Sequence, residues 1–135
     1  MTFDEMKQFI HEVAWGHLAT SDGTKVGVRP MGGIGWFEGE LWAATGRDTD
    51  KVAQLKAVPH AEYCFARPDG AHLRLAGPCT VSTDDGDKKK LWDACPMLKQ
   101  FIPDPADPGY VVLRLKPERA RFMPANTMAY EDIAL

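Results

Sequence analysis

Three glycine-bearing turns, each joining two short apolar segments, place the strongest limit on how this 135-residue chain can fold. They lie at 21–24, 38–40 and 68–70, around Gly23, Gly39 and Gly70. Glycine adopts positive φ in such turns at little cost, and alternation of apolar and polar residues beside them is typical of β-hairpins. About seven short strands with helices between them predict a mainly β, α+β protein built on a closed or nearly closed antiparallel barrel, which leaves few exposed strand edges.

The hydrophobic pattern predicts the position of each element. A first helix is expected from a cap at Thr2, with Glu5 reaching back to it, as far as Gly16. Pro78 cannot donate a ladder hydrogen bond, so we expect a bulge or a strand edge there. The expected strands are 16–20, 25–31, 34–37, 41–45, 61–66, 72–83, 110–115 and 119–123. The later expected helices are 49–58, 84–94 and a turn or two within 96–102, with an extended proline-rich loop at 103–109 and no strong signal in 124–135.

Composition narrows the class of protein. The length predicts a single domain spanning 1–135, and the formal net charge of −3 argues against a dedicated nucleic-acid binder. The N-terminus has no leader pattern and no segment is apolar enough to span a membrane, so a cytoplasmic location is the default expectation. The three cysteines and four histidines show no disulfide framework and no metal-ligand spacing. We therefore expect free thiols, wholly or partly buried, and no metal.

Three chemically suitable residues lie near the ends of successive expected elements. Arg29 is near the end of one strand, Thr45 ends another, and Lys51 lies in the first turn of the helix that follows. A helix start offers free backbone N–H groups and a partial positive charge. With an arginine, a lysine and a hydroxyl, it would suit a phosphate monoester.

Each of these residues also has a simpler interpretation. Arg29 can be a solvated strand residue paired with Glu38 or Glu40, Thr45 can merely end its strand, and Lys51 can be an exposed helix lysine. The helix can also be capped by Asp48, Thr49 or Asp50 without any ligand. The carboxylates of Asp48 and Asp50 would work against a phosphate.

The order of several short motifs resembles a known family. The chain is similar, from the first helix to about Phe122, to the pyridoxamine 5′-phosphate oxidase-like FMN-binding split-barrel family. It is most similar to the short stand-alone members grouped with nitroimidazole-reductase-like and general-stress flavoproteins. The matching segments are 16–20, 28–31, 41–45, Lys51 with 54–56, Pro59, 73–77 and 91–92.

The resemblance implies a six-stranded antiparallel split barrel and a homodimer with two flavin mononucleotide (FMN) sites between the subunits. It implies that Arg29 and Lys51 hold the FMN phosphate and that Thr45 hydrogen-bonds it. The backbone of Pro30, Met31 and Ala44 is expected along the isoalloxazine ring or the ribityl chain. Trp92 is a candidate contact from the second subunit, although an apolar anchor for its own helix is the favoured interpretation.

The resemblance leaves the activity open. A small oxidoreductase that passes electrons from a reduced donor to a small organic acceptor, such as a nitro compound or a quinone, is the leading hypothesis. A non-catalytic FMN protein for storage, sensing or electron transfer is the alternative, followed by a barrel that binds haem, a deazaflavin or single-stranded nucleic acid. Oxidation of pyridoxamine phosphate is not expected, because the chain lacks the C-terminal basic segment of those enzymes. No catalytic residue is identified, and His17 and His72 are candidates only by default.

Overall fold

The computed structural model describes all 135 residues. The helices are α1 (Phe3–Val13), α2 (Asp50–Ala57), α3 (Asp85–Ala94) and α4 (Leu98–Phe101). The strands are β1 (Gly16–Ser21), β2 (Val26–Met31), β3 (Ile34–Phe37), β4 (Glu40–Gly46), β5 (His60–Ala66), β6 (His72–Ser82), β7 (Tyr110–Leu115), β8 (Arg119–Met123) and β9 (Glu131–Asp132).

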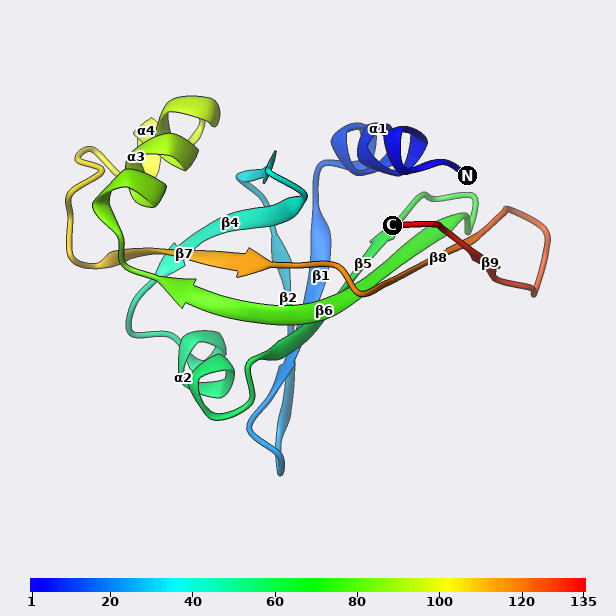
Figure 1. Cartoon of the computed structure of the whole chain (residues 1–135), viewed down its shortest axis with the longest axis horizontal. Coiled ribbons are helices and arrows are strands. Elements are labelled where there is room, and N and C mark those ends of the chain that lie inside the picture. The colour runs from blue at the N-terminus through cyan, green and yellow to red at the C-terminus, as the bar shows by residue number, and fades with distance from the viewer.

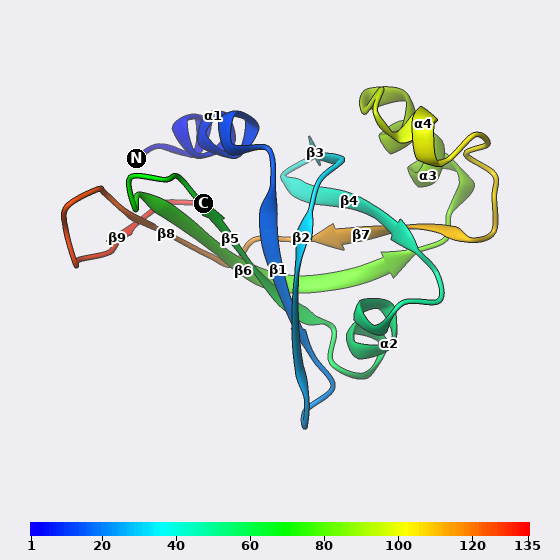
Figure 2. The same ribbon diagram turned by 180° about the vertical axis from the view of Figure 1, so that it is seen from behind.

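The strands form one strongly curled antiparallel sheet (Figures 1 and 2). Its order is β2-β1-β5-β6-β7-β4-β3, and β8 pairs with β6 and β9. The 11-residue strand β6 joins the two parts of the sheet. Its first residues pair with β8 and its last residues pair with β7. Helix α1 lies near the end that carries β8 and β9, and α3 and α4 lie near the opposite end. Helix α2 lies below the curled sheet in the view of Figure 1, whereas α1 lies above it, and both helices bury residues in the same core.

The local signals in the sequence account for most element boundaries. Gly23 and Gly70 take positive φ in two of the hairpin turns, and Glu38 and Gly39 both do so in the third, as a two-residue hairpin of this type requires. The Thr2 hydroxyl accepts a hydrogen bond from the Glu5 backbone N–H at 3.1 Å, which confirms the expected cap of α1. The Glu5 side chain makes no reciprocal bond to Thr2.

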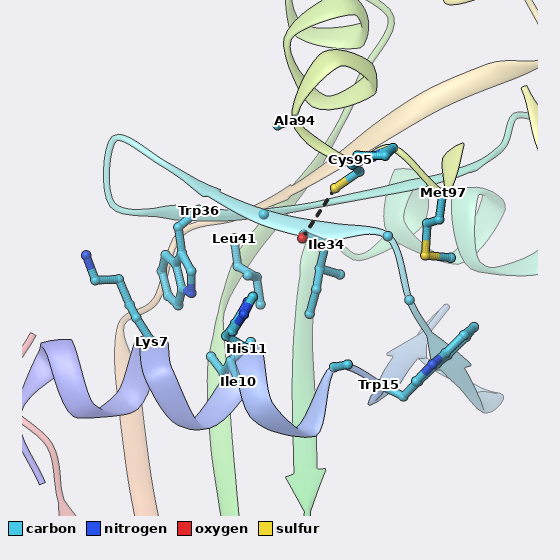
Figure 3. A pocket seen from close by; sticks show the side chains of 15 residues that line it. Lys7, Ile10, His11, Trp15, Ile34, Trp36, Leu41, Ala94, Cys95 and Met97 are labelled. Carbon is cyan, nitrogen blue, oxygen red and sulfur yellow. Dashed lines mark hydrogen bonds between the residues drawn. The ribbon is translucent and has the colours of Figure 1, made fainter. Parts of the chain in front are cut away.

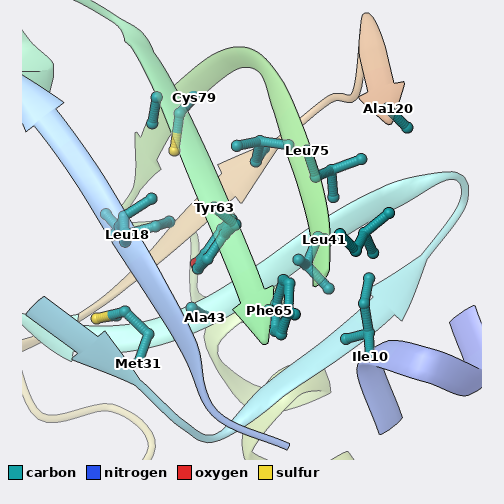
Figure 4. Close-up of a cluster of buried hydrophobic side chains, with 14 of the residues drawn as sticks. Ile10, Leu18, Met31, Leu41, Ala43, Tyr63, Phe65, Leu75, Cys79 and Ala120 are labelled. Atoms are coloured by element: carbon teal, nitrogen blue, oxygen red, sulfur yellow. The ribbon is translucent and has the colours of Figure 1, made fainter. Parts of the chain in front are cut away.

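The main hydrophobic core fills the inside of the curl. Alternate residues of the central strands point inward, so that Leu18, Tyr63 and Leu75 meet in one cluster (Figure 4). A smaller cluster around Trp42 and Leu91 packs α3 and α4 against the outer side of β4 and β7. The two clusters explain why β7 is buried on both faces.

Several sequence predictions need correction. Helix α1 ends at Val13, because Ala14 takes a positive φ of 68°, and Gly16 already begins β1. Pro78 makes neither a bulge nor an edge: it lies in the central strand β6 where the outer partner changes from β8 to β7, so its missing N–H interrupts no ladder.

The strand count and the C-terminal segment also differ from expectation. The sheet has nine strands rather than the six that the resemblance implies. Residues after Met123 carry no strong strand pattern, yet β9 pairs with β8, because Ile133 is buried and its N–H donates to the Ala120 carbonyl at 2.9 Å. The free thiols are confirmed, with Cys79 buried and the other two half-buried.

Candidate functional site

Arg29 lies half-buried on the inner side of β2, held by uncharged acceptors. It pairs in register with Leu18 of β1, which directs its side chain toward α2. Its Nη1 donates to Thr20 Oγ1 at 2.6 Å and to the carbonyl oxygens of Leu18 at 3.3 Å and Gly27 at 3.2 Å. The Thr20 hydroxyl donates in turn to Gln54 Oε1 of α2. The arginine is therefore anchored at the junction of β1, β2 and α2 with no carboxylate in ion-pair contact.

Lys51 lies half-buried in the first turn of α2, close enough to Arg29 for their charges to interact. Burial is the main cause that lowers the pKa of Lys51, and repulsion from Arg29 lowers it further, while Asp50 acts in the opposite direction. Burial likewise lowers the pKa of Arg29, again opposed by Asp50. Neither cation forms an ion pair, and Asp50 is exposed. Two neighbouring cations with incomplete neutralisation form a local positive site in a chain of net charge −3.

The start of α2 contributes free backbone donors. Thr49 is the N-cap residue, but its side chain does not cap the helix and instead donates to the Gly46 carbonyl at 2.9 Å. Asp48 is not the cap either, since its carboxylate pairs with Arg47 at 3.2 Å. The first N–H groups of α2 therefore have no side-chain acceptor, as an anion site at a helix start requires.

Thr45 and Ala44, near the end of β4, line a cavity to which α2 contributes no residue. The cavity has a volume of about 470 Å³ and lies between the end of β4, Gly32 and the segment around α4. Trp15, Met97 and Phe101 form its apolar side, and all three are exposed, Phe101 to 73%. Thr45 makes no side-chain hydrogen bond within the chain.

The other two predicted residues lie apart from this cavity lining. Pro30 is exposed on β2, and the Met31 side chain is 95% buried in the main core, as its relative exposure of 5% shows. For Met31, burial of the side chain leaves only the backbone for contact with a ligand; the sequence predicted a backbone role for both residues. The structure thus brings Arg29 and Lys51 together, groups Ala44 with Thr45, and gives no contact between the two pairs.

The simpler interpretation of Arg29, a solvated residue paired with Glu38 or Glu40, is wrong about the pairing. Glu40 pairs with Arg114, and Glu38 lies 3.8 Å from Lys90, so neither carboxylate is near Arg29. Trp92 anchors its own part of the chain, because its Nε1 donates to the Ile102 carbonyl at 2.7 Å. Its ring also packs against the smaller hydrophobic cluster, as the favoured interpretation of an apolar anchor for α3 expects.

Some residues of the site are missing from the sequence-based prediction. Thr20 and Gln54 complete the support of Arg29, but they are 34 positions apart and no local pattern connects them. Trp15, Met97 and Phe101 are recognisable only as exposed apolar residues once the fold is known. The two histidine candidates gain no support, because His17 is exposed on the outer face of β1 and His72 bonds to the Gly70 carbonyl and the Tyr130 hydroxyl.

Comparison with known proteins identifies the family and the fold. The family model described as "Pyridoxamine 5′-phosphate oxidase like" matches residues 2–131. No curated protein matches the chain. None of the helices is long and apolar enough to cross a bilayer.

Three solved structures illustrate the fold similarity. A NimC/NimA family protein from Clostridium acetobutylicum has a TM-score of 0.85 at 23% identity, covering 98% of this chain and 91% of that one. General stress protein 26 from Bacillus anthracis has a TM-score of 0.73 at 21% identity, covering 95% and 98%. A pyridoxamine 5′-phosphate oxidase-related, FMN-binding protein from Nostoc punctiforme has a TM-score of 0.71 at 18% identity, covering 96% and 87%. The expected antiparallel split-barrel fold with added helices is confirmed, and the chain belongs to the pyridoxamine 5′-phosphate oxidase-like family.

Proposed function

We propose that this protein binds FMN and uses it as a small oxidoreductase. The observation that carries the proposal is the pair of half-buried cations, Arg29 and Lys51, that have neighbouring charges and no carboxylate partner. Keeping two like charges close together and partly out of water is unfavourable unless an anion neutralises them. Membership of a family related to FMN-binding proteins makes the phosphate of FMN the leading candidate for that anion.

The available donors fit a phosphate monoester. The guanidinium of Arg29, the ammonium of Lys51 and the first N–H groups of α2 all favour a compact dianion, and the free hydroxyl of Thr45 adds a neutral donor. Asp107 lines the cavity that holds Thr45, and Asp50 opposes an anion beside the two cations. The exposure of Asp50 to solvent weakens this effect through screening.

The remaining predicted residues suit the organic part of the cofactor. Ala44 and Thr45 border the 470 Å³ cavity, whose apolar side can accept a flat ring. We assign the backbone of Pro30, Met31 and Ala44 to the isoalloxazine ring or the ribityl chain. Bound FMN would supply the redox chemistry, while the chain fixes its phosphate, orients it and limits access to it. No side chain is assigned as a proton donor or acceptor.

A homodimer is part of the proposal. Val26 and Val28 on the outer face of β2 are 77% and 67% exposed, and β2 ends the sheet without a further strand beside it. Exposed apolar side chains on an edge strand favour association with another chain. We propose that a second copy covers this face and completes two equivalent FMN sites, with a small-molecule donor and acceptor as the other partners.

The first experiment measures the absorption spectrum of the purified protein, followed by release and mass identification of any bound ligand. We expect a flavin spectrum and released FMN. A colourless protein that takes up no added FMN contradicts the proposal. Turnover of a reduced nicotinamide with an acceptor then distinguishes an oxidoreductase from the alternative, a non-catalytic FMN protein for storage, sensing or electron transfer.

The second experiment tests the phosphate contacts. Arg29→Ala and Lys51→Ala should weaken FMN binding far more than riboflavin binding, because only FMN carries the phosphate. Lys56→Ala is the matched control, since this lysine is exposed on the same helix near its other end. Equal losses for FMN and riboflavin would show that neither residue holds the phosphate.

A further inference from the structure

A second cavity of about 410 Å³ lies between α1, β3 and the connection from α3 to α4 (Figure 3). It shares Trp15, Gly32 and Met97 with the first cavity but contains neither Ala44 nor Thr45. The Trp15 ring packs closely on Gly32, where a Cβ would lie 2.8 Å from the ring. The proposed FMN contacts therefore leave this second cavity without an assigned role.

The walls of the second cavity suit a flat apolar ring. Ile34 and Ile10 face each other from β3 and α1, and the Trp36 indole closes one end (Figure 3). Phe3 packs edge-on against Trp36, with ring centroids 5.5 Å apart, and supports it from outside the cavity. An aromatic ring inserted here would contact apolar atoms on both sides.

The charges around the second cavity favour an anion. Its ionisable lining groups are Lys7, His11 and Cys95, and no carboxylate lines it. Lys7 pairs with Asp4 at 3.6 Å in an exposed ion pair, and its Nζ lies 5.5 Å from the Phe3 ring centroid. A ligand carboxylate can replace the exposed ion pair at small cost. Burial raises the pKa of the Cys95 thiol, which keeps it neutral, and the thiol donates to the Ile34 carbonyl at 3.5 Å.

One polar atom of the lining has no partner. The Trp36 Nε1 is buried without a hydrogen bond, whereas the Nε1 atoms of Trp42 and Trp92 donate to Glu40 and Ile102. An unpaired buried donor costs about 1–3 kcal/mol. A modest turn of the ring toward the cavity would let a ligand oxygen accept from this N–H.

We propose that the second cavity binds a small aromatic carboxylate, with its ring between α1 and β3 and its carboxylate directed to Lys7 and the Trp36 N–H. His11 can donate a further hydrogen bond from whichever ring nitrogen carries a proton. The proposal concerns a site separate from the FMN phosphate contacts and holds whether or not the protein binds FMN.

Benzoate is the probe, followed through the indole N–H resonances of the four tryptophans. Trp36→Phe assigns the Trp36 resonance. We expect benzoate to move this resonance saturably and downfield, as a newly formed hydrogen bond does, with smaller changes at Trp42 and Trp92. Neutral benzyl alcohol should bind more weakly, and Lys7→Gln should weaken benzoate roughly two- to fivefold, the effect of one exposed charge.

Two matched variants decide whether the site is this cavity. His11→Trp fills it from an exposed position of α1 and should abolish the benzoate response. Gln8→Trp places the same side chain at another exposed position of α1, outside the cavity lining, and should leave the response intact. Equal responses in the two variants, no response in the wild type, or equal binding of benzoate and benzyl alcohol would each overturn the proposal.

Discussion

At the residue scale, Asp50 sets the charge balance beside Arg29 and Lys51. Its carboxylate raises the pKa of both cations but forms an ion pair with neither. If the pair holds the FMN phosphate, Asp50→Asn removes a repulsion and should tighten FMN binding about two- to fivefold, the effect of one exposed charge, while leaving riboflavin binding unchanged. Fluorescence titration measures the affinities for FMN and for riboflavin. Asp48→Asn serves as the control, because Asp48 already pairs with Arg47. Weaker FMN binding in Asp50→Asn would contradict this assignment of the phosphate.

Gly77 illustrates a residue whose small size is required by packing. A Cβ at this position of β6 would lie 2.0 Å from the Lys116 carbonyl oxygen, which is backbone and cannot move independently of β7 and β8. Gly77→Ala should therefore destabilise the fold by about 2–4 kcal/mol in urea unfolding. Gly86→Ala is the comparison, since its Cβ would approach a side-chain atom, Asp84 Oδ2 at 3.0 Å, and no backbone, and alanine favours a helix. Similar stabilities of the two variants would disprove the packing argument.

At the element scale, Arg114 fastens α3 to the sheet. From β7 it pairs with Glu40 of β4 and with Asp87 of α3 at 3.0 Å, and its guanidinium lies 4.8 Å from the Trp42 ring centroid. Arg114→Met leaves two largely buried carboxylates without their cation, so we expect a loss of about 1–3 kcal/mol in unfolding free energy. Arg47→Met breaks an exposed pair with Asp48 and should cost about 0–1 kcal/mol. Equal losses would mean that Arg114 does not stabilise the contact with α3.

Local signals make some elements predictable and others not. The hairpins could be placed because turn glycines and alternating strands are encoded within a few residues, as around Gly39. Strand β9 could not, since it forms only because Ile133 finds a place in a core built from distant strands. The place of Pro78 within β6 could not be predicted either. The strand tolerates a proline there because its pairing with β8 ends and its pairing with β7 begins at that point, which no local pattern shows.

At the scale of the whole molecule, the candidate site also combines features that the local sequence predicts with features that depend on the complete fold. Arg29, Thr45 and Lys51 could be proposed because each lies near the end or the start of an element that the sequence predicts. Their support by Thr20 and Gln54, and the cavities beside Trp15, depend on the curl of the sheet that brings β1, α2 and β3 into place. The sequence-based prediction therefore named the two cations that the fold brings together but not the shape around them.

The buried ionisable groups also predict how stability depends on pH. Burial raises the pKa of the Cys79 thiol from an ordinary value of 9.0 to about 12, and that of Tyr110, mainly through burial and secondarily through Cys95, from 10.0 to about 12. Between the ordinary and the raised values, the unfolded chain has lost these protons and the folded chain has kept them. Stability is therefore unaffected by them below pH ~8 and falls above pH ~9, by about 1.4 kcal/mol per pH unit for each group.

Cys79→Ala removes the Cys79 part of this dependence, which arises before that of Tyr110. The thiol begins to contribute about one pH unit below Tyr110, so the variant should show a shallower fall in unfolding free energy between pH ~9 and ~10, whatever its stability at neutral pH. Above pH ~10 the variant should still lose stability, because Tyr110, whose hydroxyl donates to the Lys88 carbonyl at 2.8 Å, remains buried. Urea unfolding of both proteins in steps from neutral to alkaline pH, under reducing conditions, measures these slopes. Parallel curves for the two proteins across the whole range would show that the Cys79 thiol titrates alike in the folded and unfolded chains, and that its burial in the core does not shape the alkaline limit of the fold.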